Sequence, residues 1–290
     1  MIPAAFDYHA PVTLGEAVGL LQKFGDEAKV LSGGQSLLPL LKLRLGYATQ
    51  LVDIGNIPGL DYIKDEEGYL KIGAATREAE LERSELIAEQ YPILLDTAVV
   101  IADPLVRNRA TVGGNLAHGD PANDHPATML ALGARVVAVG PKGERTIPIG
   151  DFFTGLFTTA LAADEILTEI QVPQPASHSG GAYVKLERKV GDFATAASAV
   201  QVTLSSGGEF ERVGIGLTSL APTPLEATDA EAFLVGKKPD EATIAEGARL
   251  AAEVTSPTAD RRGSEEYKRE MARVLTARAL AKAVERAGGK

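Results

Sequence analysis

Cysteine and tryptophan are both missing from this chain of 290 residues. Without cysteine the chain cannot ligate an iron–sulfur cluster through thiolates, form a disulfide or build a zinc site from cysteines. Histidine is scarce as well. The four histidines are scattered, and no pair has the His-x-x-x-His spacing of a metal-binding helix. Any redox chemistry must therefore use an organic cofactor.

Long apolar runs and a basic leader are also absent. No run reaches the roughly 18 residues of a membrane span, and the Met1-Ile2-Pro3 start has no basic segment leading into an apolar one. The formal net charge of −10 argues against a nucleic-acid surface, which needs clustered lysine and arginine. The composition is that of a globular protein in water, so we expect it in the cytoplasm, with peripheral attachment at the inner membrane face left open.

The first 56 residues predict a small βαβ-like unit. Thr13 and Glu16 form a capping box that opens a helix. A short strand over 28–31 then runs directly into SGGQS at 32–36, and another strand follows at 50–54. The unit thus ends in glycine-rich backbone.

Residues 57–175 predict a larger α+β part. Two short strands flank the turn KDEEG within 60–73, helical segments run from about 76 to 102 and end at Asp103-Pro104, and strands are expected at ARVVAVG, RTIPI and EILTEIQVP. Between them, RNRATVGGNLAHGDPANDHPA at 107–127 has a glycine pair and few apolar residues, which predicts a long loop. Such a stretch is either a connector or backbone that lies against a ligand.

A cluster of Pro, Gly and Ser at 173–181 predicts a linker, and we place the domain boundary after residue 175. Beyond it, three strands predict an antiparallel meander with Gly207-Gly208 as a turn, and the chain is helical from about Glu226. The last helix should pack on the sheet through an apolar face. That face consists of Tyr267, Met271, Val274 and Leu275.

Two glycine pairs are the strongest candidates for a binding site. SGGQS at 32–36, the first glycine segment, and TVGGN at 111–115, the second, each place Gly-Gly beside hydroxyl or amide side chains. Paired glycines let backbone N–H groups approach an anion, because no Cβ intervenes and positive φ costs little. Neither segment matches the Walker loop or the G-x-G-x-x-G fingerprint. A tight turn explains one such pair better than a ligand does, whereas two pairs together make tight turns and a bound diphosphate equally good explanations.

The same segments carry a resemblance to a known family. SGGQS with TVGGN is similar to the paired FAD-diphosphate loops of flavin subunits in the molybdenum hydroxylase family, which includes xanthine dehydrogenase and aerobic carbon monoxide dehydrogenase. Five segments of the chain also resemble the carbon monoxide dehydrogenase branch of this family and occur in the same order there. They are MIPAAFDYH, IADPLVRNRATVGGN, GDPANDHPA, KLERKVGDFATAASAV and GIGLT. The chain departs from that branch at Gln35, where His is usual, and at Phe193, where Tyr is common.

The resemblance covers nearly the whole chain and implies an α+β fold. A two-part FAD-binding domain of the vanillyl-alcohol-oxidase (PCMH) type would span 1–175, divided into 1–56 and 57–175. A C-terminal α+β domain of the carbon monoxide dehydrogenase flavoprotein type, with an antiparallel sheet and helices, would span 176–290. FAD should be held non-covalently, since there is no cysteine for a thioether link and neither His9 nor His118 sits in a recognisable flavinylation motif.

The resemblance also implies which residues surround FAD. The residues that would wrap the diphosphate are Val30, Leu31, Ser32, Gly33, Gly34, Gln35, Ser36, Leu37, Thr111, Val112, Gly113, Gly114 and Asn115. The remaining contacts would be Ile101 bordering the flavin, Asp124 accepting hydrogen bonds from the adenosine portion, Leu167 and Lys185 near the cofactor, and Phe193 beside the isoalloxazine. Local sequence alone allows other interpretations: a helix cap at Asp124, a solvated Lys185 and a core aromatic at Phe193.

The implied function is that of an electron-exit subunit with no catalytic residue and no metal ligand of its own. Electrons from a molybdopterin centre on a large partner would pass through [2Fe-2S] clusters on a small iron–sulfur partner to FAD on this chain, and then to an acceptor such as a quinone. We expect a heterotrimer that pairs as a dimer of heterotrimers, with carbon monoxide as the substrate of the complex. The partner interface should lie near Ile101 and Phe193 rather than at the acidic turn 65–67.

Two kinds of alternative remain at this point. Within the same family, the complex could be a hydroxylase for purines, nicotinate or an aldehyde, because the large subunit selects the substrate. From another class, the chain could be a scaffold subunit that has lost flavin, although both glycine segments are intact. A nucleotide-binding regulatory module is a third interpretation, and neither segment matches the usual nucleotide signatures.

Overall fold

A three-stranded parallel sheet forms the N-terminal part of the computed structural model, which describes residues 1–288. Its strands lie in the order β1 (Asp7–His9), β3 (Gln50–Asp53) and β2 (Ala28–Leu31). The helix α1 (Leu14–Phe24) packs on this sheet and is followed by the 3-10 turn η1 (Gly25–Glu27), while α2 (Leu37–Leu43) follows the first glycine segment. Thr13 caps α1 by accepting a hydrogen bond from the Glu16 N–H at 3.2 Å. The βαβ-like prediction is confirmed.

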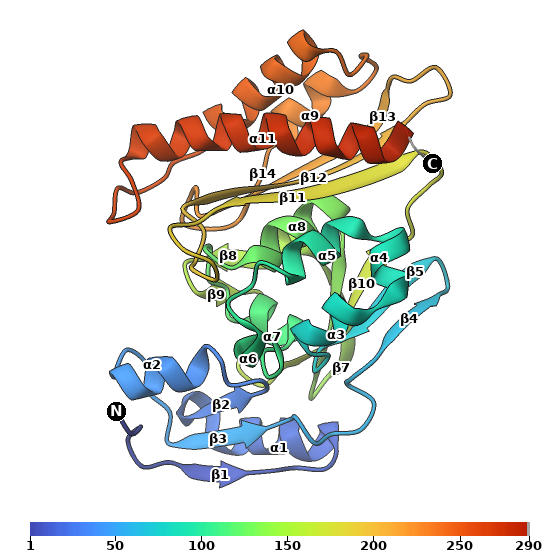
Figure 1. The fold of residues 1–290 in the computed structure, drawn as a ribbon. Coiled ribbons are helices and arrows are strands. Elements are labelled where there is room, and N and C mark those ends of the chain that lie inside the picture. The colour runs from blue at the N-terminus through green and yellow to red at the C-terminus, as the bar shows by residue number, and fades with distance from the viewer. Residues whose placement is uncertain (289–290) are drawn as a thin grey trace.

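The middle part is a five-stranded antiparallel sheet with helices packed on one face (Figure 1). Its strands lie in the order β4 (Ile63–Glu66), β5 (Tyr69–Gly73), β10 (Ile166–Pro173), β6 (Arg135–Gly140) and β7 (Gly143–Pro148). The helices are α3 (Glu78–Arg83), α4 (Glu85–Gln90), α5 (Pro92–Ala98), α6 (Pro104–Arg107), α7 (Val112–Ala117) and α8 (Asp124–Leu132). The 3-10 turn η2 (Ile149–Asp151) leads into a small hairpin of β8 (Phe153–Gly155) and β9 (Thr158–Thr159). Leu70 and Ile72 alternate along β5 to face the helices.

The C-terminal part is a four-stranded antiparallel sheet that is buried on both faces. Its strands lie in the order β11 (Ser179–Leu186), β12 (Ala196–Leu204), β13 (Phe210–Thr218) and β14 (Leu225–Glu226). One face is covered by α9 (Thr228–Leu234), α10 (Glu241–Glu253) and α11 (Glu265–Gly288), and the other by α5 and α8 (Figure 1). Along β12, Ala197 and Ala199 join the core of the middle part, whereas Val200 and Val202 join the core beneath α11. The sheet therefore ties the C-terminal part to the middle part.

The stretch 107–127 is largely helical, so the prediction of a long loop was wrong. Gly113 and Gly114 lie in the first turn of α7, and α8 already begins at Asp124. Thr111 caps α7, because its hydroxyl accepts a hydrogen bond from the Gly114 N–H at 3.2 Å. This cap, together with tertiary packing, offsets the low helix propensity of two glycines.

Two smaller expectations concern helix and linker boundaries. The helical segments expected over 76–102 are α3, α4 and α5 and the chain leaves helical structure after Ala98, but helix resumes unexpectedly at α6, which Asp103 caps. The strands extend into the expected linker, which leaves only 174–178 between β10 and β11.

The buried face of α11 differs from the predicted one. Leu275 is buried as expected, but Tyr267 is exposed, and the buried face runs instead through Ala272, Ala279 and Ala283. Lys268 also lies on this buried face. It fits there because its Nζ donates to the Thr258 carbonyl at 2.8 Å and pairs with Asp260 at 3.0 Å.

Candidate functional site

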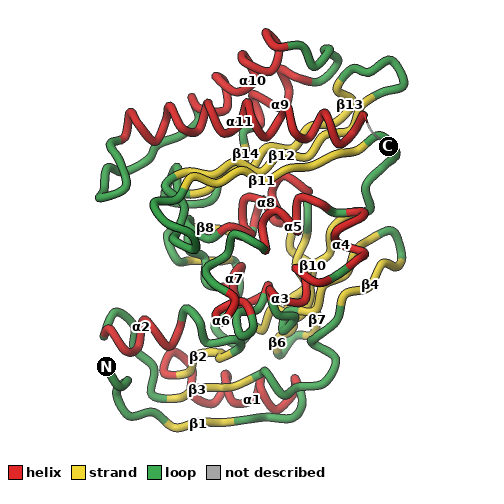
Figure 2. Tube along the Cα trace, in the orientation of Figure 1, coloured by secondary structure: helices red, strands yellow, loops and turns green. Residues whose placement is uncertain are grey.

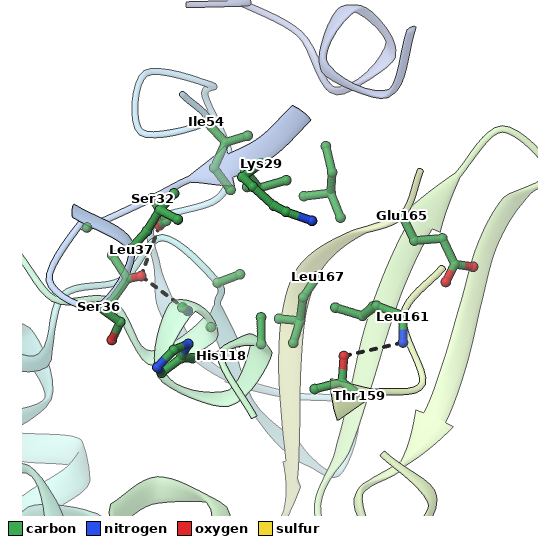
Figure 3. Close-up of a pocket in the computed structure, with 18 of the residues that line it drawn as sticks. Lys29, Ser32, Ser36, Leu37, Ile54, His118, Thr159, Leu161, Glu165 and Leu167 are labelled. Atoms are coloured by element: carbon green, nitrogen blue, oxygen red, sulfur yellow. Dashed lines mark hydrogen bonds between the residues drawn. The ribbon is translucent and has the colours of Figure 1, made fainter. Parts of the chain in front are cut away.

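A cleft with a volume of about 340 Å³ separates the N-terminal part from the middle part. The strand β2, the first glycine segment and α7 form one wall, and β10 and the chain after β9 form the other (Figure 3). Most of the residues predicted to wrap the diphosphate line this cleft. The predicted residues that line it are Val30, Ser32, Gly33, Gly34, Gln35, Ser36, Leu37, Thr111, Gly113, Gly114, Asn115 and Leu167.

The two glycine segments touch each other inside the cleft. The hydroxyls of Ser32 and Thr111, which are 79 residues apart in sequence, are joined by a hydrogen bond of 2.9 Å (Figure 3). A Cβ at Gly33 would lie 2.1 Å from the Arg109 carbonyl oxygen, so only glycine allows this approach. Gly34 adopts a φ of +77°, which L side chains rarely occupy. Together the segments make one continuous wall of backbone.

Unsatisfied polar groups in this wall show what it could hold. The N–H groups of residues 33–36 donate no backbone hydrogen bond to a described residue. Asn115 lines the cleft, and its Oδ1 is buried without a hydrogen-bond partner in the part of the chain that the structure describes. Leaving such an acceptor unpaired costs about 1–3 kcal/mol, so a ligand with both donors and a negative charge fits here. Beside these groups, Val30, Leu37 and Leu167 provide an apolar surface. The residues present fit the diphosphate and ring portions of FAD.

Asp124 and Lys185 form a second, separate cluster that does not line the cleft. Lys185 Nζ donates to Asp124 Oδ2 and to the Val100 carbonyl, both at 3.0 Å, and the Tyr183 hydroxyl donates to Asp124 Oδ1 at 2.6 Å. Burial raises the pKa of Asp124, while Lys185 and Tyr183 act in the opposite direction. Asp124 does not cap α8, and the Lys185 side chain is only 3% exposed. Both local alternatives, a helix cap and a solvated lysine, were therefore wrong.

Ile101 and Phe193 lie on two loops that pack against each other. The loop after α5 is held by two cations, because Lys185 binds the Val100 carbonyl and Arg107 donates to the Ile101 carbonyl at 3.0 Å. Gly191 packs on the same loop, where an added Cβ would lie 2.4 Å from the Ala102 carbonyl oxygen. This contact brings Phe193, which is half exposed, to the same side of the molecule. Phe193 is thus not an ordinary core residue.

Two of the predicted site residues face away from the cleft. Val112 is fully buried in the core of the middle part, and Leu31 packs against the small core beneath α2. Each of these two residues is a direct sequence neighbour of residues that line the cleft. Their role in the structure is to anchor the glycine segments from behind.

Sequence reasoning missed several residues that line the cleft. The missed residues with ionisable side chains are Asp26, Lys29, His118 and Glu165, and the side chains of Lys29 and His118 extend into the cleft in Figure 3. Ile54, Thr159 and Leu161 complete the walls. His118 could have been found from its spacing, because it follows Gly114 by four residues and so shares a helix face with it. Nothing local pointed to Thr159 and Leu161, which depend on the β8–β9 hairpin.

The described residues contain neither a metal-binding cluster nor a membrane-spanning helix. Within residues 1–288, no group of three or more His, Asp or Glu side chains is arranged to hold a metal ion. No helix in that range is both long and apolar enough to cross a membrane.

Comparison with known proteins covers the whole chain. Residues 4–175 match the family model for the FAD binding domain in molybdopterin dehydrogenase, and residues 181–283 match that for the CO dehydrogenase flavoprotein C-terminal domain. The chain is 44% identical over 287 residues to the carbon monoxide dehydrogenase medium chain of Afipia carboxidovorans, covering 99% of both chains. It is 38% identical over 287 residues to the 6-hydroxypseudooxynicotine dehydrogenase complex subunit alpha of Paenarthrobacter nicotinovorans, covering 99% of this chain and 97% of that one.

A solved structure agrees with these matches. The chain superimposes with a TM-score of 0.96 and 46% identity on a chain of carbon monoxide dehydrogenase from Hydrogenophaga pseudoflava in a form that lacks the Mo-pyranopterin moiety of the molybdenum cofactor. The superposition covers 99% of both chains.

Proposed function

The chain belongs to the family of FAD-binding subunits of molybdopterin-dependent dehydrogenases, and on that premise we propose that it is the flavoprotein subunit of an aerobic carbon monoxide dehydrogenase. Full-length identity of 44% to a medium chain of that enzyme supports this assignment. The observation that carries it is the meeting of both glycine segments in one cleft.

The cleft would hold FAD chiefly through backbone. The free N–H groups of 33–36 would donate to the diphosphate. In the second glycine segment, where the N–H groups of 112–115 already donate within the protein, the Asn115 side chain would contribute instead, and its Oδ1 would accept from the ribityl or ribose hydroxyls. Val30 and Leu167 would exclude water from the ring systems. Bound FAD supplies the capacity to take up electrons and pass them on, whereas the protein supplies position and electrostatics.

We assign Asp124 and Lys185 to the isoalloxazine end of the site. The resemblance placed Asp124 at the adenosine, but its ion pair with Lys185 and the link from Lys185 to Val100 support a place beside Ile101. At that end, Lys185 lies between Asp124 at 3.0 Å and Glu187 at 3.4 Å, so it would balance their charges and fix the loop at Val100 beside the ring. Phe193 would shield the ring from the solvent side.

Three neighbouring loops form the surface where we propose that the iron–sulfur subunit docks. This loop surface consists of residues 99–109, 187–193 and 260–262, which are joined by the Gly191–Ala102 contact and by an ion pair of Arg262 with Asp192 at 2.9 Å. In Figure 2, loops gather at this edge of the molecule, where β11 and β12 are connected. The large apolar side chains exposed there are Val99, Leu105, Val190 and Phe193.

Charge on the loop surface indicates the chemistry of the partner. The exposed side chains of Arg109, Lys189 and Arg261 make no ion pair with a residue in 1–288, although the whole chain has a net charge of −10. An apolar centre with a cationic rim suits a partner with an acidic rim, and thiolate-ligated clusters are themselves anionic. We therefore expect an acidic face around the cluster of the small subunit.

The docking proposal can be tested with two matched valines. Val190 is 94% exposed on the loop surface, and Val235 is 48% exposed at the far end of α9. Val190→Glu should weaken assembly with the partner subunits at least about tenfold, because it places a charge at the centre of the interface, while Val235→Glu should leave assembly unchanged. Equal assembly of both variants, measured by native mass spectrometry, would place the interface elsewhere.

The cofactor assignment is tested on the purified chain. Acid precipitation should release yellow FAD into the supernatant, because there is no cysteine available for a thioether link. A colourless protein that also fails to bind added FAD would overturn the proposed function and support the scaffold interpretation.

The assembly and substrate are tested on the native complex. We propose a dimer of heterotrimers with the iron–sulfur and molybdopterin subunits, in the cytoplasm or at the inner membrane face, with a quinone as acceptor. Anaerobic addition of carbon monoxide should bleach the flavin of this complex. If a purine, a nicotinate-type ring or an aldehyde bleaches the flavin instead, only the proposed substrate is replaced. The 38% identity to a 6-hydroxypseudooxynicotine dehydrogenase subunit makes a related molybdenum hydroxylase the second candidate function.

A further inference from the structure

His118 occupies a position in the cleft that none of the assigned roles uses. It follows the last turn of α7, and its N–H donates to the Gly114 carbonyl at 3.1 Å. Because residues three and four apart share a helix face, the imidazole lies one turn beyond Gly114 and Asn115. Figure 3 shows the ring reaching into the cleft on the side of Ser36.

The two ring nitrogens of His118 have no partner in the described chain. Neither makes a hydrogen bond with a residue in 1–288, and the ring instead packs against Phe157 with centroids 5.2 Å apart. Phe157 is fixed there by the hydrogen bond from its N–H to the Gly119 carbonyl at 3.0 Å. The tip of the β8–β9 hairpin therefore packs against the imidazole, and both ring nitrogens are available to bind a ligand in the cleft.

The charges that face His118 are few. The hairpin tip 156–159 and the first glycine segment contain no ionisable side chain, and the second glycine segment contains none. Burial lowers the pKa of His118, and the nearby Asp120 carboxylate works in the opposite direction. The other ionisable side chains in the cleft lining are Lys29 on β2, Asp26 in η1 and Glu165 just before β10, and Glu165 is paired with Arg145 at 2.7 Å. Among these ionisable residues, His118 is the one that lies one turn beyond the second glycine segment, so a diphosphate on both glycine segments would lie toward its imidazole.

We propose that His118 is a protonatable ligand of the FAD diphosphate: neutral in the free chain, it takes up a proton when the cofactor binds. This inference rests on the proposed function, because it requires that FAD lies in this cleft. An opposite charge within about 4–6 Å favours the charged form of a titratable group. The bound state consequently holds the proton more tightly than the free state, and by linkage FAD binds more tightly as the pH falls.

The proposal predicts a specific pH dependence of FAD affinity. The full-length chain is stripped of FAD, and the dissociation constant is measured by flavin fluorescence between about pH 5.5 and about pH 8.5. Affinity of the unaltered chain should fall about tenfold across this range, which corresponds to a shift of about one pKa unit on binding. His118→Asn should bind FAD with an affinity that is nearly flat over the same range.

His178→Asn is the matched control, because His178 lies in the loop before β11 and does not line the cleft. It should keep the pH dependence of the unaltered chain. Calorimetry in two buffers of different ionisation enthalpy provides a second measurement on the unaltered chain, and should detect uptake of up to about one proton on binding near neutral pH. This measurement decides the question even if His118→Asn fails to fold.

The outcomes separate this inference from the proposed function. FAD that binds with no pH dependence and no proton uptake, or with the same dependence in His118→Asn, overturns the role of His118 alone. Failure of the unaltered chain to bind FAD at any pH overturns the proposed function and this inference with it.

Discussion

The two glycine pairs meet in one cleft but use glycine for different reasons. In the first segment, Gly34 takes a φ of +77° in a loop, and Gly33 lies against the backbone at Arg109. In the second segment, the pair lies in the first turn of α7, and a Cβ at Gly113 would come within 2.5 Å of Ala74 Cβ. One pair shapes a turn, whereas the other lets a helix pack tightly and present its end to the cleft. The same dipeptide therefore carries different penalties for substitution.

The largest expected effect comes from Gly33→Val. A side chain at this position would collide with the Arg109 carbonyl, which is backbone and cannot move aside, so the two segments must separate. We expect a loss of more than about 3 kcal/mol in the free energy of unfolding together with complete loss of FAD. Chemical denaturation and flavin content measure the two effects. Gly15→Ala is the control, since a Cβ there meets nothing within 4 Å and should be neutral or stabilising.

Gly114→Val should act on cofactor binding more than on the fold. Its Cβ would lie 2.7 Å from Thr111 Oγ1, a hydroxyl that can rotate away, but the side chain would stand in the cleft. We expect FAD affinity to fall at least about 100-fold, a loss of about 2.8 kcal/mol, because the valine side chain would occupy space in the cleft where the diphosphate lies. Gly207→Val, in the distal turn between β12 and β13, should keep full FAD occupancy. Equal occupancy in both variants would show that the second glycine segment is not part of the FAD site.

Thr111→Ala separates capping from binding. Thr111 caps α7 and bonds Ser32, whereas Thr13 caps α1 alone. Both Thr111→Ala and Thr13→Ala should lower the free energy of unfolding by about 1 kcal/mol, but only Thr111→Ala should also weaken FAD binding. If Thr13→Ala weakens FAD binding to the same degree, the effect is one of general stability.

The smallest expected effect is that of Ser32→Ala, which removes the hydrogen bond between the segments and leaves both backbones in place. The free energy of unfolding should fall by about 0.5–1.5 kcal/mol. A double-mutant cycle of Ser32→Ala with Thr111→Ala should give a coupling energy of at least about 0.5 kcal/mol. Strict additivity would mean that the contact between the glycine segments is carried by Gly33 alone.

The elements of the fold could largely be predicted, whereas some boundaries could not. Short runs of apolar and β-branched residues bounded by turn residues located β4, β5, β6, β7 and β10 correctly, because both signals are local in the sequence. The helix α7 was missed because its two glycines have low helix propensity, and the factors that stabilise it, the Thr111 cap and the packing on Ala74, involve tertiary contacts. The buried face of α11 was misplaced because Lys268 is neutralised by Asp260, which local periodicity does not reveal.

The candidate site shows the same division. Its backbone residues were identified from the glycine pairs, because the lack of a Cβ gives glycine the same backbone freedom wherever it occurs. We propose another place for Asp124 than the resemblance implied, because the structure pairs it with Lys185, which is 61 residues away in sequence. His118 and the β8–β9 hairpin that supports it were not identified as part of the site at all.

By itself, the sequence determined the chemistry that this chain can perform. The absence of cysteine excludes thiolate-bound clusters, and the two glycine pairs provide backbone donors for a diphosphate, because these properties belong to residue types. Only the tertiary structure decided which groups act together: the Ser32–Thr111 contact, the buried pair of Asp124 and Lys185, and the imidazole of His118 in the cleft. Such pairings depend on the packing of whole sheets and helices, which is a sum over many weak contacts and leaves no local pattern.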